Sequence, residues 1–226
     1  MQSLKGGFRV IDRKGLYFLV DPQGKRVNSR PWLGDTFSFL YDRIMEKSVF
    51  PKKFAADPEL HYDILTWLLH GIHGKNVLEI ATGSGSAARF LRNDNRYVGT
   101  DISPGLLKLA RKRLVKAGFR EPELYVVSAD ALPFADHSFD LALCMLSLNF
   151  FGDAEAVFRE LRRVLKLEGI FVCSVPVPER ASPGAVIHGT LRSEDELREL
   201  CERHCLHYES LTQENGALLY FRAKAR

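Results

Sequence analysis

After residue 76 the chain repeats one pattern five times, and this repetition limits the folds that it can adopt. Each time, a run of five to eight mostly apolar residues is followed by polar or helix-forming residues. Parallel strands are buried on both faces by helices, so this alternation is typical of a parallel sheet. The five runs are NVLEIA (76–81), RYVGT (96–100), ELYVVS (123–128), FDLALCML (139–146) and GIFVCSV (169–175). We therefore predict an α/β fold.

The segments between and after these runs carry helix signals. Ser103 suits an N-cap, and Gly118 suits the left-handed stop of the same helix. Apolar residues at helical spacing predict a second helix over 153–165. Ser193 and Glu196 form a capping box that predicts the start of a third helix.

The end of the chain predicts two more strands. LHYESL and ALLYFRA flank the turn QENG, which is the pattern of an antiparallel hairpin. Added to the five runs, these strands predict a Rossmann-like, doubly wound sheet of seven strands, mostly parallel with an antiparallel C-terminal hairpin. We assign residues 71–226 to this domain.

Residues 1–70 follow a different pattern and form a predicted N-terminal extension. Short apolar runs broken by DRKG and DPQG over 8–28 predict a β-hairpin or a three-stranded meander. Two amphipathic helices are expected next, the second with Leu60, Ile64, Trp67 and Leu68 on one face. We expect this extension to form either a lid over the ligand-binding site or an oligomer contact, and both interpretations stay open.

Composition excludes several classes of protein. Apolar residues make up 46% and the formal net charge is +4 without a clustered basic patch, so we expect a globular protein with no nucleic-acid partner. The absence of an 18-residue apolar run and of a secretory signal predicts a cytoplasmic protein that does not span a membrane. Cys201, His204, Cys205 and His207 are competent zinc ligands, but they lack finger-like spacing, and we expect no metal site. We expect a monomer or a homodimer.

The stretch VLEIATGSGSAARFL joins the first predicted strand to a predicted helix. Gly83 and Gly85 lie at the junction, where backbone N–H groups face a ligand above the strand tips. With Ala88 in the third position and Asp101 further on, the stretch also satisfies the relaxed dinucleotide fingerprint. Glycines used only for a tight turn are a further interpretation.

Acidic residues near the tips of the first three predicted strands narrow the choice of ligand. Glu79 lies inside an apolar strand, where an ionised carboxylate costs several kcal/mol unless it has a partner. Its charge would repel a pyrophosphate and attract an ammonium or sulfonium group. Asp101 ends the second strand and can accept both hydroxyls of a ribose, and Asp130 follows the third strand beside an apolar wall. This order favours S-adenosylmethionine over a dinucleotide.

At these residues the sequence resembles the class I S-adenosylmethionine-dependent methyltransferases, in particular the quinone-biosynthesis C-methyltransferases. The resemblance is carried by VLEIATGSGSAARFL, YVGTDISPGLLKLARKRL, SADALPFADHSFDLALCMLSLNFF and AVFRELRRVLKLEGIFVCSVP. The cofactor-binding residues that it implies are Glu79, Ala81, Gly83 and Gly85 around the methionine, Asp101 at the ribose, Ile102, Asp130 and Ala131 at the adenine, and Tyr41, which closes over the cofactor. Ala81 replaces the family's first glycine, so the backbone there must tolerate a Cβ atom.

The acceptor site is less constrained. Asn149, in LSLNFF at the tip of the fourth strand, is our candidate for an acceptor-facing catalytic residue, and a turn-capping role is the alternative. His188, in the loop AVIHGT, is a candidate base or an ordinary surface histidine. We predict methyl transfer to a small molecule through an O, N or C nucleophile. An NAD(P)-dependent oxidoreductase and a non-catalytic S-adenosylmethionine-binding protein are the alternatives.

Overall fold

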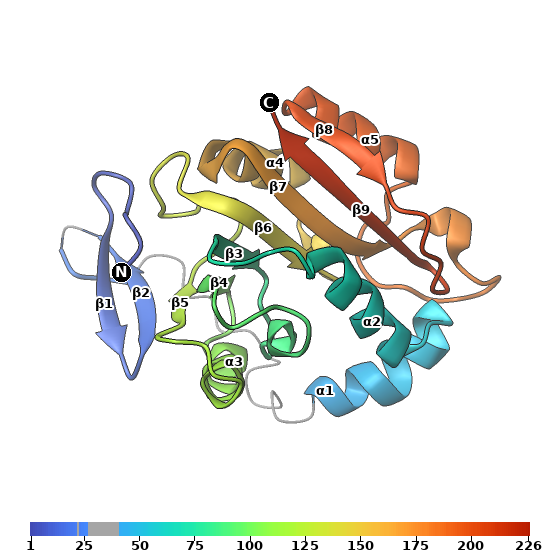
Figure 1. The fold of residues 1–226 in the computed structure, drawn as a ribbon, viewed down its shortest axis with the longest axis horizontal. Helices are drawn as coiled ribbons and strands as arrows, with labels where there is room; N and C mark the ends of the chain where they lie inside the picture. Colours follow the sequence, from blue (N-terminus) through green and yellow to red (C-terminus); the bar gives the residue numbers. More distant parts are fainter. Residues whose placement is uncertain (22, 27–40) are drawn as a thin grey trace.

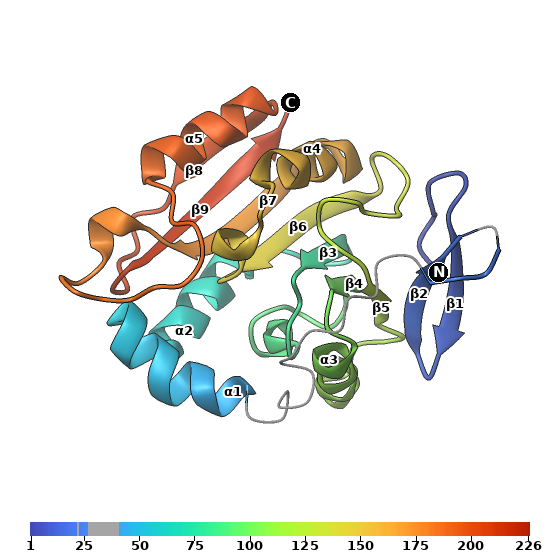
Figure 2. The same cartoon turned by 180° about the vertical axis from the view of Figure 1, so that it is seen from behind.

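The computed structural model describes residues 1–21, 23–26 and 41–226, and it shows one mixed sheet with helices on both faces (Figures 1 and 2). The sheet has nine strands in the order β1-β2-β5-β4-β3-β6-β7-β9-β8. The strands are β1 (Arg9–Arg13), β2 (Leu16–Val20), β3 (Asn76–Ile80), β4 (Arg96–Asp101), β5 (Glu123–Val126), β6 (Phe139–Met145), β7 (Leu165–Pro176), β8 (Leu206–Ser210) and β9 (Leu218–Ala225).

The five predicted apolar runs form β3 to β7, which pair in parallel around β3. Val77, Leu78 and Ile80 of β3 are fully buried, as expected of a strand covered on both faces. The C-terminal pair also forms as predicted, since β9 pairs antiparallel with both β7 and β8. Along the chain, β4 and β5 are added on one side of β3, whereas β6 and β7 are added on the other side. This switch opens a crevice above the strand tips.

The prediction of seven strands is wrong, because the N-terminal hairpin joins the same sheet. β1 and β2 pair antiparallel, and β2 pairs in parallel with β5. The rings of Tyr17 and Tyr125 stack across this junction, with their centroids 4.9 Å apart. Without β2, the edge of β5 would expose unpaired N–H and C=O groups. The hairpin therefore completes the sheet rather than standing apart from it.

The helices cover the sheet in two layers, and each layer has its own hydrophobic core. On one face lie α2 (Pro58–Leu69), α3 (Pro104–Lys116) and the wide helix η2 (Met45–Phe54), which continues from α1 (Tyr41–Ile44). On the other face lie α4 (Ala154–Val164) and α5 (Glu194–Arg203). The sheet is therefore doubly wound, as predicted. Among the described residues, none of the helices has both the length and the apolar character needed to cross a bilayer.

The caps predicted at Ser103 and Ser193 are confirmed. The side chain of Ser103 accepts a hydrogen bond from the N–H of Leu106, and Asp153 caps α4 in the same way. Ser193 and Glu196 form the full capping box of α5. Each cap satisfies N–H groups that the first turn of a helix leaves unpaired.

Two helix predictions need correction. The stretch after the glycine turn forms only the short 3₁₀ helix η3 (Ser86–Arg89), because Phe90 and Leu91 are already buried beneath α3 and α2. In α2 the predicted apolar face is also wrong: Trp67 is 64% exposed and Leu60 is 41% exposed. The buried face holds His61, Ile64, Leu65 and Leu69. The first predicted amphipathic helix falls largely on residues outside the described part of the chain.

The chain between β7 and α5 contains only two short features, a 3₁₀ turn η5 (Pro178–Arg180) and an extended return along the sheet edge. The Arg180 guanidinium donates to the backbone carbonyl of Leu218 at 3.1 Å, which holds the start of this segment against β9. The later part of the segment passes the tip of β6, where η4 (Leu148–Phe150) begins. The segment around Ile187 and His188 therefore forms part of the crevice wall.

Candidate active site

Two adjoining cavities lie above the tips of β3 to β6. The inner recess is small, about 40 Å³, and lies between β3 and the helices η2 and α2. The outer cavity is about 600 Å³ and extends over β4, β5 and η4. The two share a wall made by Met45, Ala81, Gly83 and Leu146. The two cavities therefore meet at the glycine turn.

The glycine turn forms the shared wall through an unusual backbone. Ala81 has φ +52°, and Gly83 has φ +57°, so both lie in the left-handed region. Ala81 thus occupies a conformation that favours glycine, at a cost of about 1 kcal/mol. The backbone does tolerate a Cβ at this position, as the sequence requires, and Ala81 lines both cavities.

Gly85 has a different role from the one predicted. A Cβ atom there would lie 2.7 Å from the Cα of Ala110 in α3, and its φ is +83°. Gly85 therefore allows the turn to pack directly on α3. Among the described residues that line the two cavities, Gly85 does not occur.

Glu79 is 1% exposed and faces the inner recess. The partner that its burial requires is Tyr97 of β4, whose hydroxyl donates to the Glu79 carboxyl. Burial raises the pKa of Glu79 to about 8; the Tyr97 hydrogen bond opposes this shift, and the negative charge of Asp101 adds to it. In the protein without cofactor, desolvation thus favours the neutral acid at pH 7.

Asp101 lies at the tip of β4 and lines the outer cavity. One carboxylate oxygen accepts the N–H of Gly83 at 2.8 Å, and the other accepts the N–H of Ser103 at 2.8 Å. These bonds fix the plane of the carboxylate and join the glycine turn to the start of α3. The carboxylate is thereby held at the wall of the outer cavity.

The residues predicted at the adenine end lie further along the outer cavity. Ile102 is 51% exposed and lines it, as does the exposed Asp130. Ala131 does not occur in the lining; its N–H donates to Ser128 within the turn after β5. Ser128 and Ala129 line the cavity instead. The predicted order of acids, from Glu79 through Asp101 to Asp130, is present along the two cavities.

A polar cluster ties the N-terminal helices to the glycine turn. The Ser84 hydroxyl donates to the Asp42 carboxylate, and the Arg113 guanidinium of α3 donates to both Asp42 and Ser84. These hydrogen bonds hold the pKa of Asp42 below its ordinary value, although its partial burial acts in the opposite direction. The cluster places η2 over the inner recess. The side chain of Tyr41, the neighbouring predicted residue, lies outside the described part of the structure.

Asn149 and His188, the two predicted acceptor-site residues, both line the outer cavity. The Asn149 amide donates to the His188 backbone carbonyl at 2.7 Å, and Asn149 is 3% exposed. The backbone carbonyl of Asn149 in turn accepts the N–H of Thr190 at 2.7 Å. Gly189 allows this close approach, since a Cβ there would lie 2.3 Å from that oxygen. Asn149 thus holds the 188–190 segment against η4, and the imidazole of His188 is exposed at the rim.

Comparison with known proteins shows similarity to methyltransferases. A family profile described as "Methyltransferase domain" matches residues 78–173. The chain is 34% identical over 139 residues to demethylmenaquinone methyltransferase of Thermotoga maritima, covering 59% of this chain and 58% of that protein. It is 40% identical over 101 residues to a ubiquinone/menaquinone biosynthesis C-methyltransferase of Xanthomonas oryzae, covering 42% and 40%. Over residues 78–173 the chain thus matches a methyltransferase domain, and it is similar to methyltransferases of quinone biosynthesis. Its matches span roughly half the length of these relatives.

Solved structures share the fold of this chain at low sequence identity. A SAM-dependent methyltransferase from Aquifex aeolicus has a TM-score of 0.60 at 16% identity, covering 84% of this chain and 97% of that chain. Geranyl diphosphate C-methyltransferase from Streptomyces coelicolor has a TM-score of 0.60 at 16% identity, covering 74% and 76%. Neither of these is an oxidoreductase.

Sequence reasoning missed two residues of this candidate site. Arg113 belongs to a basic run that resembled a solvated helix face, and its position one turn before the end of α3 gave no sign of contact with Asp42. His61 lies on α2 and lines the inner recess at 2% exposure. Burial lowers the pKa of His61 to about 3, so its imidazole is neutral. The sequence signal for the burial of His61 was its position one helical turn before Leu65, on the same face of the helix.

Proposed function

We propose that this protein transfers a methyl group from S-adenosylmethionine to a small, predominantly apolar acceptor. The observation that carries the proposal is the order of the acids along two adjoining cavities. Glu79 faces the inner recess, and Asp101 and Asp130 line the outer cavity. An amino-acid head, a ribose and an adenine follow one another in the same order in this cofactor.

The residues present fit the cofactor. Asp101, oriented by two backbone N–H groups, would bind the ribose, and Ile102 offers an exposed apolar surface for the adenine. Glu79, Ala81 and Gly83 would surround the methionine, and Asp130 would lie at the adenine edge. When bound, the cofactor supplies an activated methyl group, so the protein's task is to align the acceptor and exclude water. Alignment of this kind is worth about 7 to 11 kcal/mol.

The acceptor subsite is the part of the outer cavity beyond Asp101. Its walls include Val49, Phe54 and Ile187, and Phe150 is 63% exposed at its edge. Such a lining favours an acceptor with a large apolar part. We propose that Asn149 positions the 188–190 segment as one wall, and that His188 is available at the rim to accept a proton from an acidic acceptor.

The relatives named above suggest the first acceptors to test, because they act in menaquinone and ubiquinone biosynthesis. Purified protein is incubated with methyl-labelled S-adenosylmethionine and a panel of demethylated quinols and simple phenols, followed by extraction into organic solvent. We expect labelled product from at least one acceptor, and a strong loss of product with Asp101→Asn. Label transfer that is absent from the whole panel and from a cell metabolite extract would favour a non-catalytic binding protein.

A further inference from the structure

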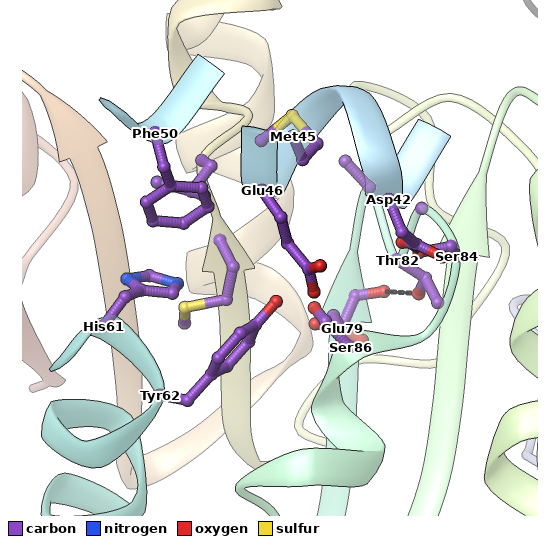
Figure 3. Close-up of a pocket in the computed structure, with 14 residues that line it drawn as sticks. Asp42, Met45, Glu46, Phe50, His61, Tyr62, Glu79, Thr82, Ser84 and Ser86 are labelled. Atoms are coloured by element: carbon purple, nitrogen blue, oxygen red, sulfur yellow. Dashed lines mark hydrogen bonds between the residues drawn. The ribbon is translucent and has the colours of Figure 1, made fainter. Parts of the chain in front are cut away.

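His61 forms one wall of the inner recess, opposite Glu79. Figure 3 shows its imidazole pointing from α2 into the recess between Phe50 and Tyr62, whereas Glu79 enters from β3 on the far side. The His61 and Phe50 rings are 5.2 Å apart between centroids. His61 is therefore held rigidly, and its edge faces the space where Glu79 ends.

A chain of hydrogen bonds assigns the tautomer of His61. Asn215 accepts the N–H of Asp57 through Oδ1 at 2.8 Å and donates to the carbonyl of Asp57 through Nδ2 at 2.8 Å, so its amide orientation is fixed. The same Nδ2 donates to the Tyr220 hydroxyl at 3.3 Å. That hydroxyl has one proton of its own, and Nδ1 of His61 lies 2.9 Å away. A buried hydroxyl proton needs an acceptor, so Nδ1 accepts it.

The neutral imidazole therefore carries its proton on Nε2. Among the residues that the structure describes, no acceptor for this N–H is present. Three acids line the recess, and each has a partner: Asp42 is bound by Arg113, Glu79 by Tyr97, and Glu46 by Arg89 at 3.5 Å. His61 adds a neutral donor opposite Glu79.

The size of the recess selects what can bind between them. About 40 Å³ leaves room for about three water-sized groups, which suits a carboxylate and an ammonium but excludes an aromatic ring. The head of an amino acid carries both of these groups. An ammonium gains from Glu79, and a carboxylate gains from the N–H of His61.

We propose that Nε2–H of His61 donates a hydrogen bond to the carboxylate of the cofactor's methionine moiety, and that Tyr220 and Asn215 keep His61 in the tautomer that can do so. The proposal rests on the proposed function, because it assumes that the methionine end enters the inner recess. It makes His61 a binding residue that distinguishes an amino-acid head from a shorter or decarboxylated one.

The test compares His61→Asn with His61→Gln. An asparagine amide can still face Tyr220 at the position of Nδ1, but it does not extend to the position of Nε2. A glutamine amide reaches that position and keeps a donor there. Binding is measured by calorimetry with three probes: S-adenosylhomocysteine, decarboxylated S-adenosylmethionine, and 5′-methylthioadenosine, which lacks the whole amino-acid head.

We expect His61→Asn to bind S-adenosylhomocysteine about 10- to 100-fold more weakly, the range for a lost hydrogen bond to a charged group. Its affinity for the two probes without a carboxylate stays within about twofold of the wild type, and His61→Gln restores most of the loss. Equal losses for all three probes, or no loss for any, would overturn the proposal. Wild-type protein that binds none of the probes would instead overturn the proposed function on which it rests.

Discussion

Asp101→Asn should destabilise the protein even without any ligand. The two carboxylate oxygens of Asp101 accept the N–H groups of Gly83 and Ser103, both at 2.8 Å. Asparagine has nearly the same shape but only one acceptor oxygen. Its NH₂ group must therefore face one of the two N–H groups, and Ser103 is only 1% exposed, so water does not replace the lost acceptor there.

The size of the effect follows from the lost bond. A hydrogen bond to a charged acceptor contributes about 1.5 to 3 kcal/mol, and a buried N–H left without a partner costs about 1 to 3 kcal/mol. Because the two estimates describe the same loss, we expect a decrease of about 2 to 3 kcal/mol in the free energy of unfolding. For a chain of this length each kcal/mol shifts Tm by about 2 to 4 °C, which predicts a decrease of about 4 to 12 °C.

Differential scanning calorimetry without ligand measures this change, and Asp130→Asn is the matched control. Asp130 is exposed, and among the described residues no hydrogen bond to its side chain is present. Its substitution should leave the free energy of unfolding within about 0.5 kcal/mol of the wild type. Equal Tm values for the two variants would refute the anchoring role of Asp101, even if both bound cofactor weakly.

Three other changes test separate parts of the structure. Gly85→Ala should cost about 2 to 5 kcal/mol of stability, because its backbone is left-handed and the added Cβ overlaps α3. Gly152 has open space around it, so Gly152→Ala should change the denaturant midpoint little, and this midpoint is measured for both variants. Burial raises the pKa of Glu79 from 4.5 to about 8, so the contribution of this carboxyl to stability is full below about pH 4.5 and is lost as the pH rises towards 8. Glu79→Gln should therefore flatten this part of the Tm–pH profile. Arg113→Gln removes a half-exposed contact to Asp42 and should cost about 1 kcal/mol or less, while trypsin should cleave within 43–53 faster than in the wild type.

Much of the fold follows from local rules that act within one segment. The caps at Ser103, Asp153 and Ser193 depend only on neighbouring residues, and all three are present. Partners that are distant in the sequence were harder to predict. Nothing in the run LYFLV indicates that it pairs with β5, which lies about a hundred residues further along the chain. Likewise, the apolar face of α2 is set by what packs on it, so Trp67 is exposed and His61 is buried.

For the site, too, local patterns were predictable and contacts between distant residues were not. Strand tips of a parallel sheet meet at one edge, so Glu79, Asp101 and Asp130 could be placed together from their positions after strands. The His61–Tyr220 pair joins residues 159 positions apart, and no local pattern contains it. Gly85 was predicted to shape the methionine pocket, yet it serves contact with α3, because a glycine motif does not reveal which glycine faces a ligand.

The preference of the inner recess for a cationic ligand does not come from a fixed negative charge on Glu79. In the protein alone, burial keeps Glu79 protonated at neutral pH, so the inner recess carries no strong negative charge from this residue. An ammonium group that enters the recess stabilises the ionised form, and the carboxyl then loses its proton. An anionic group, such as a pyrophosphate, gains nothing from that ionisation and finds the neutral acid instead. Burial thus lets Glu79 respond to the charge of the ligand. Selectivity for an amino-acid head over a dinucleotide therefore depends on the hydrophobic surroundings of one carboxyl as much as on the carboxyl itself.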